Sequence, residues 1–362
     1  MRGHSKKLNN RGFIVFSTLF ITITIIAIAI RKSIILVKNS SLFSDQFTDE
    51  YNYWAVSHFL FSRGISFEKE MELLNFSKEM KEAIRFAYEN NPSLNEENGL
   101  SRQPPYVWRI LFPASARTIS ALGISLENSF LIVYGLSLSS IICLFIFIIT
   151  KRLRSTISYK QIALTLCLFL TLLEIFTPLH PDMLSCALLL YSLYFLITNR
   201  SLQFIITALL ALLTKEINLI LFLAPILYHM THKANLNSKS RFFALTSILV
   251  GLITWYALLC WVSIPVSSSP FFGINEKVFG APAVYRLLNL IFYLSLGFLL
   301  FNRENKNRSS VSTFLLLFGF GYLLILLFIG GYDLRYIMCV FPAILLLEYT
   351  NNIGLNRVVD IY

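Results

Sequence analysis

Long apolar runs separated by short polar stretches dominate the pattern of this chain. A helix needs about 20 apolar residues to cross the hydrocarbon core of a bilayer. By that criterion the 362-residue sequence predicts about ten membrane segments, including two short ones. They cover residues 13–37, 130–149, 162–177, 183–198, 204–213, 217–230, 242–264, 284–301, 314–329 and 336–347. We therefore expect an all-α fold, a polytopic membrane helical bundle.

Residues 38–127 form the one sizeable stretch between predicted segments, and we interpret them as a large first loop outside the membrane. Within that loop, residues 67–88 place apolar side chains at helical spacing with Glu and Lys between them, which predicts an amphipathic helix on the membrane surface. Residues 107–122 combine apolar sequence with two arginines and predict a second interfacial helix. No repeat or linker divides the chain, so we expect a single membrane domain over residues 1–362.

The composition agrees with the membrane class. Hydrophobic residues make up 56% of the chain and charged residues only 14%, against about 25% charged in ordinary soluble domains. The net charge of +11 does not indicate a nucleic-acid partner, because the Lys and Arg residues lie mainly in short loops between apolar runs. All five cysteines lie within apolar runs, where neither a zinc site nor a disulfide framework is expected.

The cations occupy alternate loops of the predicted segments, and cytoplasmic loops are the ones enriched in Lys and Arg. We therefore predict that both termini lie in the cytoplasm, together with the loops that hold these cations. The residues concerned are Arg2, Lys6, Lys7, Arg11, Lys151, Arg152, Arg154, Lys160, Arg200, Lys233, Lys239, Arg241, Arg303, Lys306, Arg308 and Arg357.

The same topology brings the remaining embedded charges to the outer side. Charges at membrane depth are costly and usually mark a functional cavity. Random placement would spread them over both sides of the membrane. The residues predicted on the outer side are Asp45, Asp49, Glu50, Asp182, Lys215, Glu216, Asp333 and Arg335.

Five short motifs, in chain order, resemble those of GT-C glycosyltransferases, polytopic membrane enzymes that take a sugar from a polyprenyl-phosphate donor outside the cytoplasm. The first motif, an acidic pair followed by an aromatic residue and a short helix ending at glycine, is similar to their first outer-loop signature. The motifs are Asp49-Glu50-Tyr51 with Ala55, Leu60 and Gly64; Pro105-Tyr106-Val107-Trp108-Arg109 to Pro113; His180-Pro181-Asp182; Thr214-Lys215-Glu216; and Asp333-Leu334-Arg335-Tyr336 with Pro342.

The resemblance implies a catalytic role for the acidic cluster. Transfer of a sugar to a hydroxyl needs a carboxylate to take the acceptor proton. Asp49 is implied as this general base, and Glu50 would orient it or bind the acceptor. Asp45 belongs to the same cluster. The alternative is that Asp45 and Asp49 only cap the helix that begins near Glu50, because Asp is a preferred N-cap residue.

The cations and the remaining motif residues are candidates for substrate binding. Arg335, Lys215 and Arg109 would stabilise the leaving lipid phosphate, although Arg109 could instead reach the interface and Lys215 could only neutralise Glu216. The other substrate-binding candidates are His180, Asp182, Asp333 and Tyr336. His180 and Asp182, two residues apart, do not by themselves make a metal site, so we expect them to have a structural or substrate-orienting role instead of binding a metal. A divalent cation, Mg²⁺ or Mn²⁺, stays open as a cofactor.

The sequence thus predicts a hexosyl or pentosyl transferase of the plasma or inner membrane, with its active site on the extracytoplasmic face. Its partners would be a polyprenyl-phosphate sugar donor, membrane lipids, and a glycan, lipid or protein acceptor. One alternative is a transporter or flippase of lipid-linked sugars, because transporters hold charges between broken helices. An O-antigen-type polymerase or ligase is a further alternative, although the large outer loop of those proteins comes late in the chain.

Overall fold

The computed structural model describes part of the chain, and that part is helical. The described residues are 19–30, 53, 56–57, 72, 82, 109–153, 180–231, 238–262 and 310–329. Helices with short turns make up these ranges, which contain no strand. The expected all-α class is therefore confirmed for the described residues. The chain divides into two compact units, Met1–Ala187 and Leu188–Tyr362.

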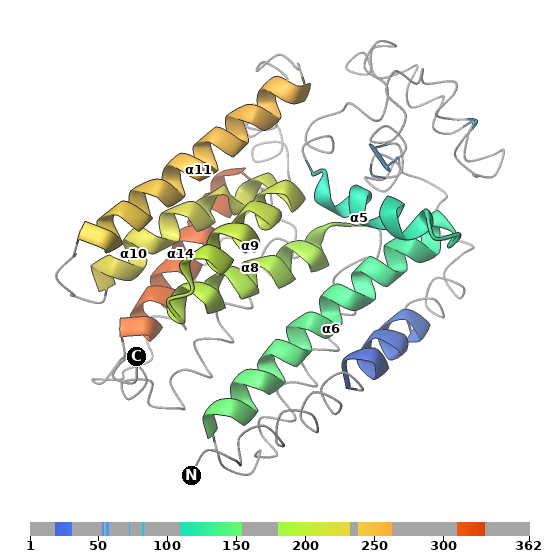
Figure 1. The fold of residues 1–362 in the computed structure, drawn as a ribbon, viewed down its shortest axis with the longest axis horizontal. Coiled ribbons are helices and arrows are strands. Elements are labelled where there is room, and N and C mark those ends of the chain that lie inside the picture. Colours follow the sequence, from blue (N-terminus) through green and yellow to red (C-terminus); the bar gives the residue numbers. More distant parts are fainter. Residues whose placement is uncertain are drawn as a thin grey trace, which may run out of the picture. The chain divides into compact units, whose positions relative to one another are not determined.

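In the first unit, two helices pack around an aromatic core. Helix α5 spans Leu111–Ser120, and α6 spans Leu126–Leu153 (Figure 1). The rings of Tyr53 and Phe112 meet edge to face with centroids 5.7 Å apart, and those of Phe112 and Phe130 lie 5.0 Å apart. These three side chains are fully or almost fully buried with Ala116 and Val133. This core fixes α5 against the first turns of α6.

The helix Leu19–Ile30 packs on α6 at a position where α6 has small residues. A Cβ atom added at Gly135 would lie 2.9 Å from a side-chain carbon of Ile28 and 3.3 Å from the carbonyl oxygen of Thr24. One turn further on, the hydroxyls of Thr24 and Ser139 share a hydrogen bond of 2.6 Å. Small residues at this spacing let two helix backbones approach closely, as they do between membrane helices.

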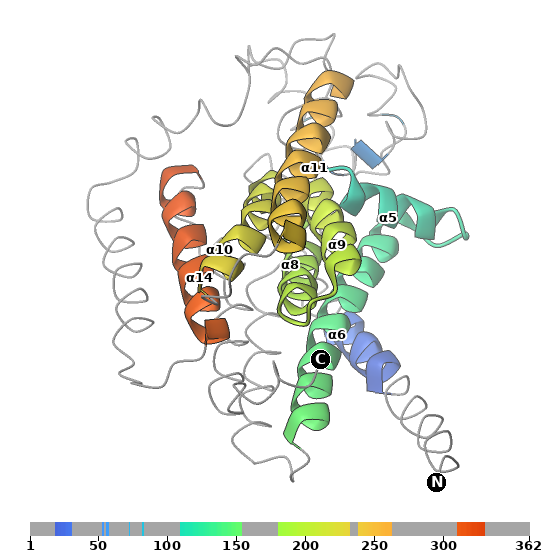
Figure 2. The same cartoon turned by 60° about the vertical axis from the view of Figure 1, so that its left-hand side comes forward.

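The described part of the second unit is helical. Helix α8 begins in the first unit and ends in the second. The elements are α8 (Asp182–Ile197), α9 (Ser201–Thr214), the 3₁₀ helix η3 (Glu216–Leu223), α10 (Ala224–Thr231), α11 (Ser238–Val262) and α14 (Ser310–Ile329). Figure 2 shows α10 beside α14, and the rings of Tyr228 and Phe314 from these two helices meet edge to face with centroids 5.2 Å apart. Gly251 of α11 gives room to the ring of Phe222 in η3.

Two of the described helices are long and apolar enough to cross a membrane. They are the stretch Asn128–Ile148 of α6, with a mean hydropathy of 2.5, and Ser240–Cys260 of α11, with a mean hydropathy of 2.0. Shorter apolar helices, of 10–17 residues, are Leu19–Ile30, Asp182–Ile197, Ser201–Thr214 and Glu216–Thr231. Three of the predicted membrane segments, residues 162–177, 284–301 and 336–347, lie outside the described residues.

The predicted helices agree with the structure over most of the described residues. Helices occupy the predicted segments 130–149, 183–198, 204–213, 242–264 and 314–329, and α5 lies within the predicted interfacial helix. Of the predicted amphipathic helix, the structure describes Glu72 and Glu82, which are helical and exposed. One segment differs, since residues 217–230 form η3 followed by α10 instead of a single α-helix. Pro225 suits the first turn of α10, where its missing N–H group costs nothing.

Candidate functional site

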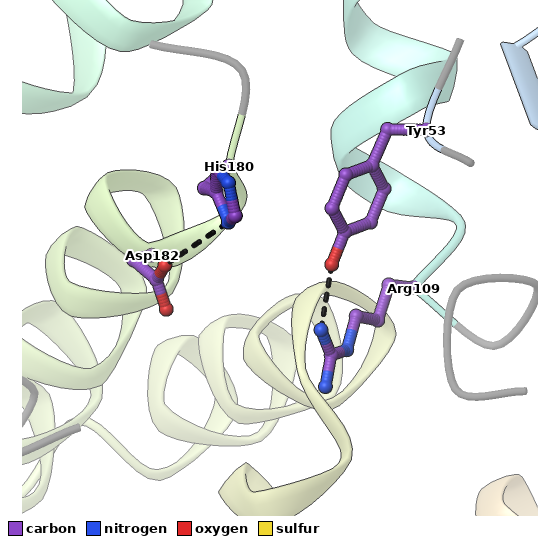
Figure 3. A network of polar contacts seen from close by, with 4 residues as sticks. All are labelled: Tyr53, Arg109, His180 and Asp182. Carbon is purple, nitrogen blue, oxygen red and sulfur yellow. Dashed lines mark hydrogen bonds and ion pairs between the residues drawn. The ribbon is translucent and has the colours of Figure 1, made fainter. Parts of the chain in front are cut away.

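A buried cluster of four polar side chains lies in the first unit (Figure 3). Arg109 lies two residues before α5, with Ile110 between them. His180 lies two residues before α8, and Asp182 is the first residue of that helix. Tyr53 is helical and belongs to the aromatic core. The cluster therefore joins three segments that are far apart in the sequence.

Arg109 and Tyr53 form one half of the cluster. The guanidinium Nη1 of Arg109 donates a hydrogen bond of 2.6 Å to the phenolic oxygen of Tyr53. The arginine residue is only 7% exposed, and the tyrosine is fully buried. Arginine stays protonated in proteins, so this contact holds a positive charge away from water. A guanidinium in such a position suits an anionic partner with planar geometry, a carboxylate or a phosphate.

His180 and Asp182 form the other half. Nδ1 of His180 lies 3.9 Å from the nearer carboxylate oxygen of Asp182, and both residues are buried. The distance exceeds that of a hydrogen bond, so the pair attracts by charge only when the imidazole is protonated. Tyr53 connects the two halves, since its ring lies edge-on to that of His180 with centroids 6.2 Å apart. Asp182 occupies the first turn of α8, where the helix dipole favours a negative charge, as the sequence predicts.

Tyr53 was missed as a site residue in the sequence interpretation. It stands in the aromatic run Tyr51, Tyr53, Trp54, in which no local pattern singles out one ring. One signal was available, because Tyr53 follows Asp49 by four residues. That spacing puts two side chains on the same face of a helix.

In the second unit, the helical path breaks at a buried lysine. Lys215 has extended backbone angles, φ −158° and ψ 125°, between α9 and η3, and the residue is only 3% exposed. The carbonyl oxygen of Ala211 accepts two hydrogen bonds there, from the backbone N–H of Lys215 and from the side-chain amide of Asn218, each 2.9 Å long. A helix interruption at this motif is what the sequence predicts, but the stabilising role of Asn218 was missed.

The remaining candidates divide into described and undescribed residues. Glu216 is the first residue of η3 and is partly buried. The described ranges contain no group of three or more His, Cys, Asp or Glu side chains that could hold a metal ion. Six candidates from the sequence lie outside the described residues, namely Asp45, Asp49, Glu50, Asp333, Arg335 and Tyr336.

Comparison of the chain with protein-family models, with curated proteins and with solved structures finds no match.

Proposed function

We propose that this protein is a polytopic membrane glycosyltransferase of the GT-C type. It would move a sugar from a polyprenyl-phosphate donor to an acceptor outside the cytoplasm. It would be a bundle of about ten membrane segments with both termini in the cytoplasm. The proposal rests on the motif resemblance and on two features of the described helices.

The first supporting feature is the surface of α11. A 25-residue helix that is apolar all round exposes Phe242, Leu245, Leu249, Leu252 and Tyr256. Soluble monomers rarely leave such large apolar patches in contact with water. A lipid environment accounts for this surface, and the close contact of Leu19–Ile30 with α6 at Gly135 fits membrane packing as well.

The observation that carries the proposal is the buried cluster of Tyr53, Arg109, His180 and Asp182. Three of its members, Arg109, His180 and Asp182, are also substrate-binding candidates by the motif resemblance. Ionisable side chains placed together within an apolar protein are costly and usually functional. Tyr53 follows Asp49 by four positions in the sequence, so the cluster and the proposed base belong to neighbouring positions of one segment.

The candidate residues have the following roles in the proposed transfer reaction. Asp49 would take the proton of the acceptor hydroxyl, and Glu50 would orient Asp49 or bind the acceptor. Arg109 would bind the phosphate of the donor by its planar fork of N–H groups. His180 and Asp182 would orient the sugar through hydrogen bonds. Further substrate contacts, on the predicted outer side, are assigned to Lys215, Glu216, Asp333, Arg335 and Tyr336.

A transporter or flippase of lipid-linked sugars is the second candidate, and the break at Lys215 favours it. Secondary transporters build their sites from interrupted helices near the membrane midplane. The 14 residues of α9 rise about 21 Å, less than the roughly 30 Å of a hydrocarbon core. If one end of α9 lies at the membrane surface, Lys215 at its other end lies at membrane depth.

The test uses membranes that contain the full chain and a panel of polyprenyl-phosphate hexoses and pentoses. We expect sugar transfer to an endogenous acceptor in the native protein. Asp49→Asn removes the base and should lower the transfer rate roughly 100-fold or more. Glu72→Gln is the matched control, the loss of one exposed carboxylate from the same predicted loop, and should retain the rate within a few-fold.

Full transfer by Asp49→Asn would refute the assignment of the base. Movement of intact lipid-linked sugar between the two leaflets, without chemical conversion, would instead support the flippase. In that case Lys215→Met should stop the movement, since it removes the buried charge at similar side-chain length.

A further inference from the structure

A pocket of about 180 Å³ lies in the second unit, where the turn between α8 and α9 meets the end of α10 and the start of α11. We call it the Arg200 pocket. The residues that line it are Leu196, Asn199, Arg200, Ser201, Tyr228, His229, Ser240 and Phe243. Its volume is below the roughly 300–1,000 Å³ of pockets for drug-sized ligands, so it suits a small ionic group.

The turn between α8 and α9 forms one wall of the pocket. Asn199 has a positive φ of 55°, which reverses the chain after α8, and the N–H of Arg200 donates to the carbonyl of Phe195 at 2.8 Å. Helix α9 then begins at Ser201, and no side chain caps its N-terminus. The first N–H groups of a helix have no partner within the helix, and together they form its positive end. Ser201 brings that end to the pocket.

Most side chains around the pocket are polar, and none of its lining residues is acidic. Hydroxyls come from Tyr228, Ser201 and Ser240, and a ring nitrogen comes from His229. The guanidinium of Arg200 is exposed and makes no ion pair with any carboxylate in the described part of the chain. The pocket is therefore a concave, electropositive site that offers both an arginine and a helix N-terminus, the two groups that proteins use to bind phosphate.

We propose that the Arg200 pocket binds a phosphate group, and that the phosphate is the headgroup of an anionic phospholipid. The apolar face of α11 points to the lipid. It begins at the turn of α11 that supplies Ser240 and Phe243 to the pocket, and it exposes Phe242, Leu245 and Leu249 at helical spacing. A headgroup in the pocket thus leaves its acyl chains beside an apolar helix surface. By the predicted topology this is the cytoplasmic side, distinct from the side of the proposed transfer reaction.

Native mass spectrometry of the full chain in neutral micelles tests the proposal, with phosphatidylglycerol as the probe and phosphatidylcholine as the neutral lipid. We expect the native protein to retain phosphatidylglycerol selectively. Arg200→Ala should weaken its retention roughly 10- to 100-fold, the loss of a charge-assisted contact. Arg241→Ala is the matched control, because Arg241 is also exposed near the start of α11 but does not line the pocket. It should retain the lipid as the native protein does.

A second pair of variants keeps the test independent of folding. Ser240→Asp places a carboxylate in the pocket, whereas Ser238→Asp places one in the same turn of α11 outside it. Only the first should release the lipid. Equal losses in Arg200→Ala and Arg241→Ala, or undiminished retention in Arg200→Ala, would overturn the proposal.

A parallel titration with inorganic phosphate distinguishes the two sources of the ligand. Saturable phosphate binding that depends on Arg200, without selective lipid retention, would keep the phosphate site and refute its lipid headgroup. The measurement does not involve sugar transfer, so its outcome is independent of the proposed enzyme activity.

Discussion

Helices α6 and α11 are alike in sequence and opposite in surroundings. Both contain a 21-residue apolar stretch with a mean hydropathy of 2.0 or more. In an 18-residue part of this stretch, 72% of the residues of α6 are buried inside the protein, whereas for α11 the share is 22%. A high mean hydropathy therefore indicates that a helix is shielded from water, but it does not indicate whether protein or lipid covers the helix.

The difference shows what each helix needs from its neighbours. Helix α6 fits its partners by shape and by polar contacts, with Phe130 in the aromatic core and Gly135 and Ser139 against the helix Leu19–Ile30. Helix α11 contacts α9, η3 and α10, with Phe243 against Phe204 and Gly251 against Phe222, and it exposes large apolar side chains on its other face. Substitutions on the two helices should therefore have different costs.

The largest contrast is expected between two Phe→Ala substitutions. Phe130 of α6 is fully buried, and Phe130→Ala should lower the free energy of unfolding by about 3–5 kcal/mol, because it removes contacts and leaves a cavity. Phe242 of α11 is 73% exposed, and Phe242→Ala should cost about 0.5 kcal/mol or less. Denaturant unfolding of both variants in the same micelles measures the difference. Equal costs would mean that another part of the chain covers Phe242.

A charge on the outer face of α11 should have the next largest effect. Leu249 lies near the middle of that helix and is 58% exposed. In a lipid environment, Leu249→Arg should cost about 2.5–3.5 kcal/mol, the price of an arginine at the centre of a membrane helix. We expect less folded protein to be recovered from the membrane fraction, with Leu249→Ala as the control. Unchanged recovery of Leu249→Arg would mean that water covers this face, and it would refute α11 as a membrane span.

The smallest effect concerns one serine on each helix. Ser139 of α6 hydrogen-bonds Thr24, and Ser139→Ala should cost about 0.6 kcal/mol, the average for such bonds between membrane helices. Ser247 of α11 is buried, and its hydroxyl has no hydrogen-bond partner in the described part of the chain. Ser247→Ala should be neutral or slightly stabilising, because it removes an unsatisfied polar group. A double-mutant cycle of Thr24→Ala with Ser139→Ala isolates the pairwise term, and no coupling would show that the two hydroxyls do not interact.

The helices were predictable because burial in a continuous apolar run is a local property of the sequence. The segment 314–329 and the start of α8 at Asp182 could be assigned from run length and from the preference of Asp for a helix N-terminus. The 3₁₀ form of the segment that follows α9 was not predictable from apolarity. The break before η3 involves Lys215 and Asn218, whose backbone and side-chain N–H groups both donate to the carbonyl of Ala211.

The candidate site was predictable only residue by residue. Arg109, His180 and Asp182 could be selected because an ionisable group beside apolar sequence is conspicuous. Their proximity to Tyr53 depends on packing between segments distant in the chain, and Arg109 is separated from Tyr53 by 56 positions. Periodicity carries no information about such contacts. The roles of Asp49, Arg335 and the other undescribed candidates stay predictions.

Because η3 is a 3₁₀ helix, it is longer than an α-helix with the same number of residues. A 3₁₀ helix rises about 2.0 Å per residue and an α-helix about 1.5 Å. The eight residues of η3 therefore extend roughly 16 Å, and the eight of α10 add roughly 12 Å. As one α-helix, Glu216–Thr231 would measure only about 24 Å, but with η3 it measures about 28 Å. Sixteen residues thus come close to the roughly 30 Å thickness of a hydrocarbon core without any added sequence.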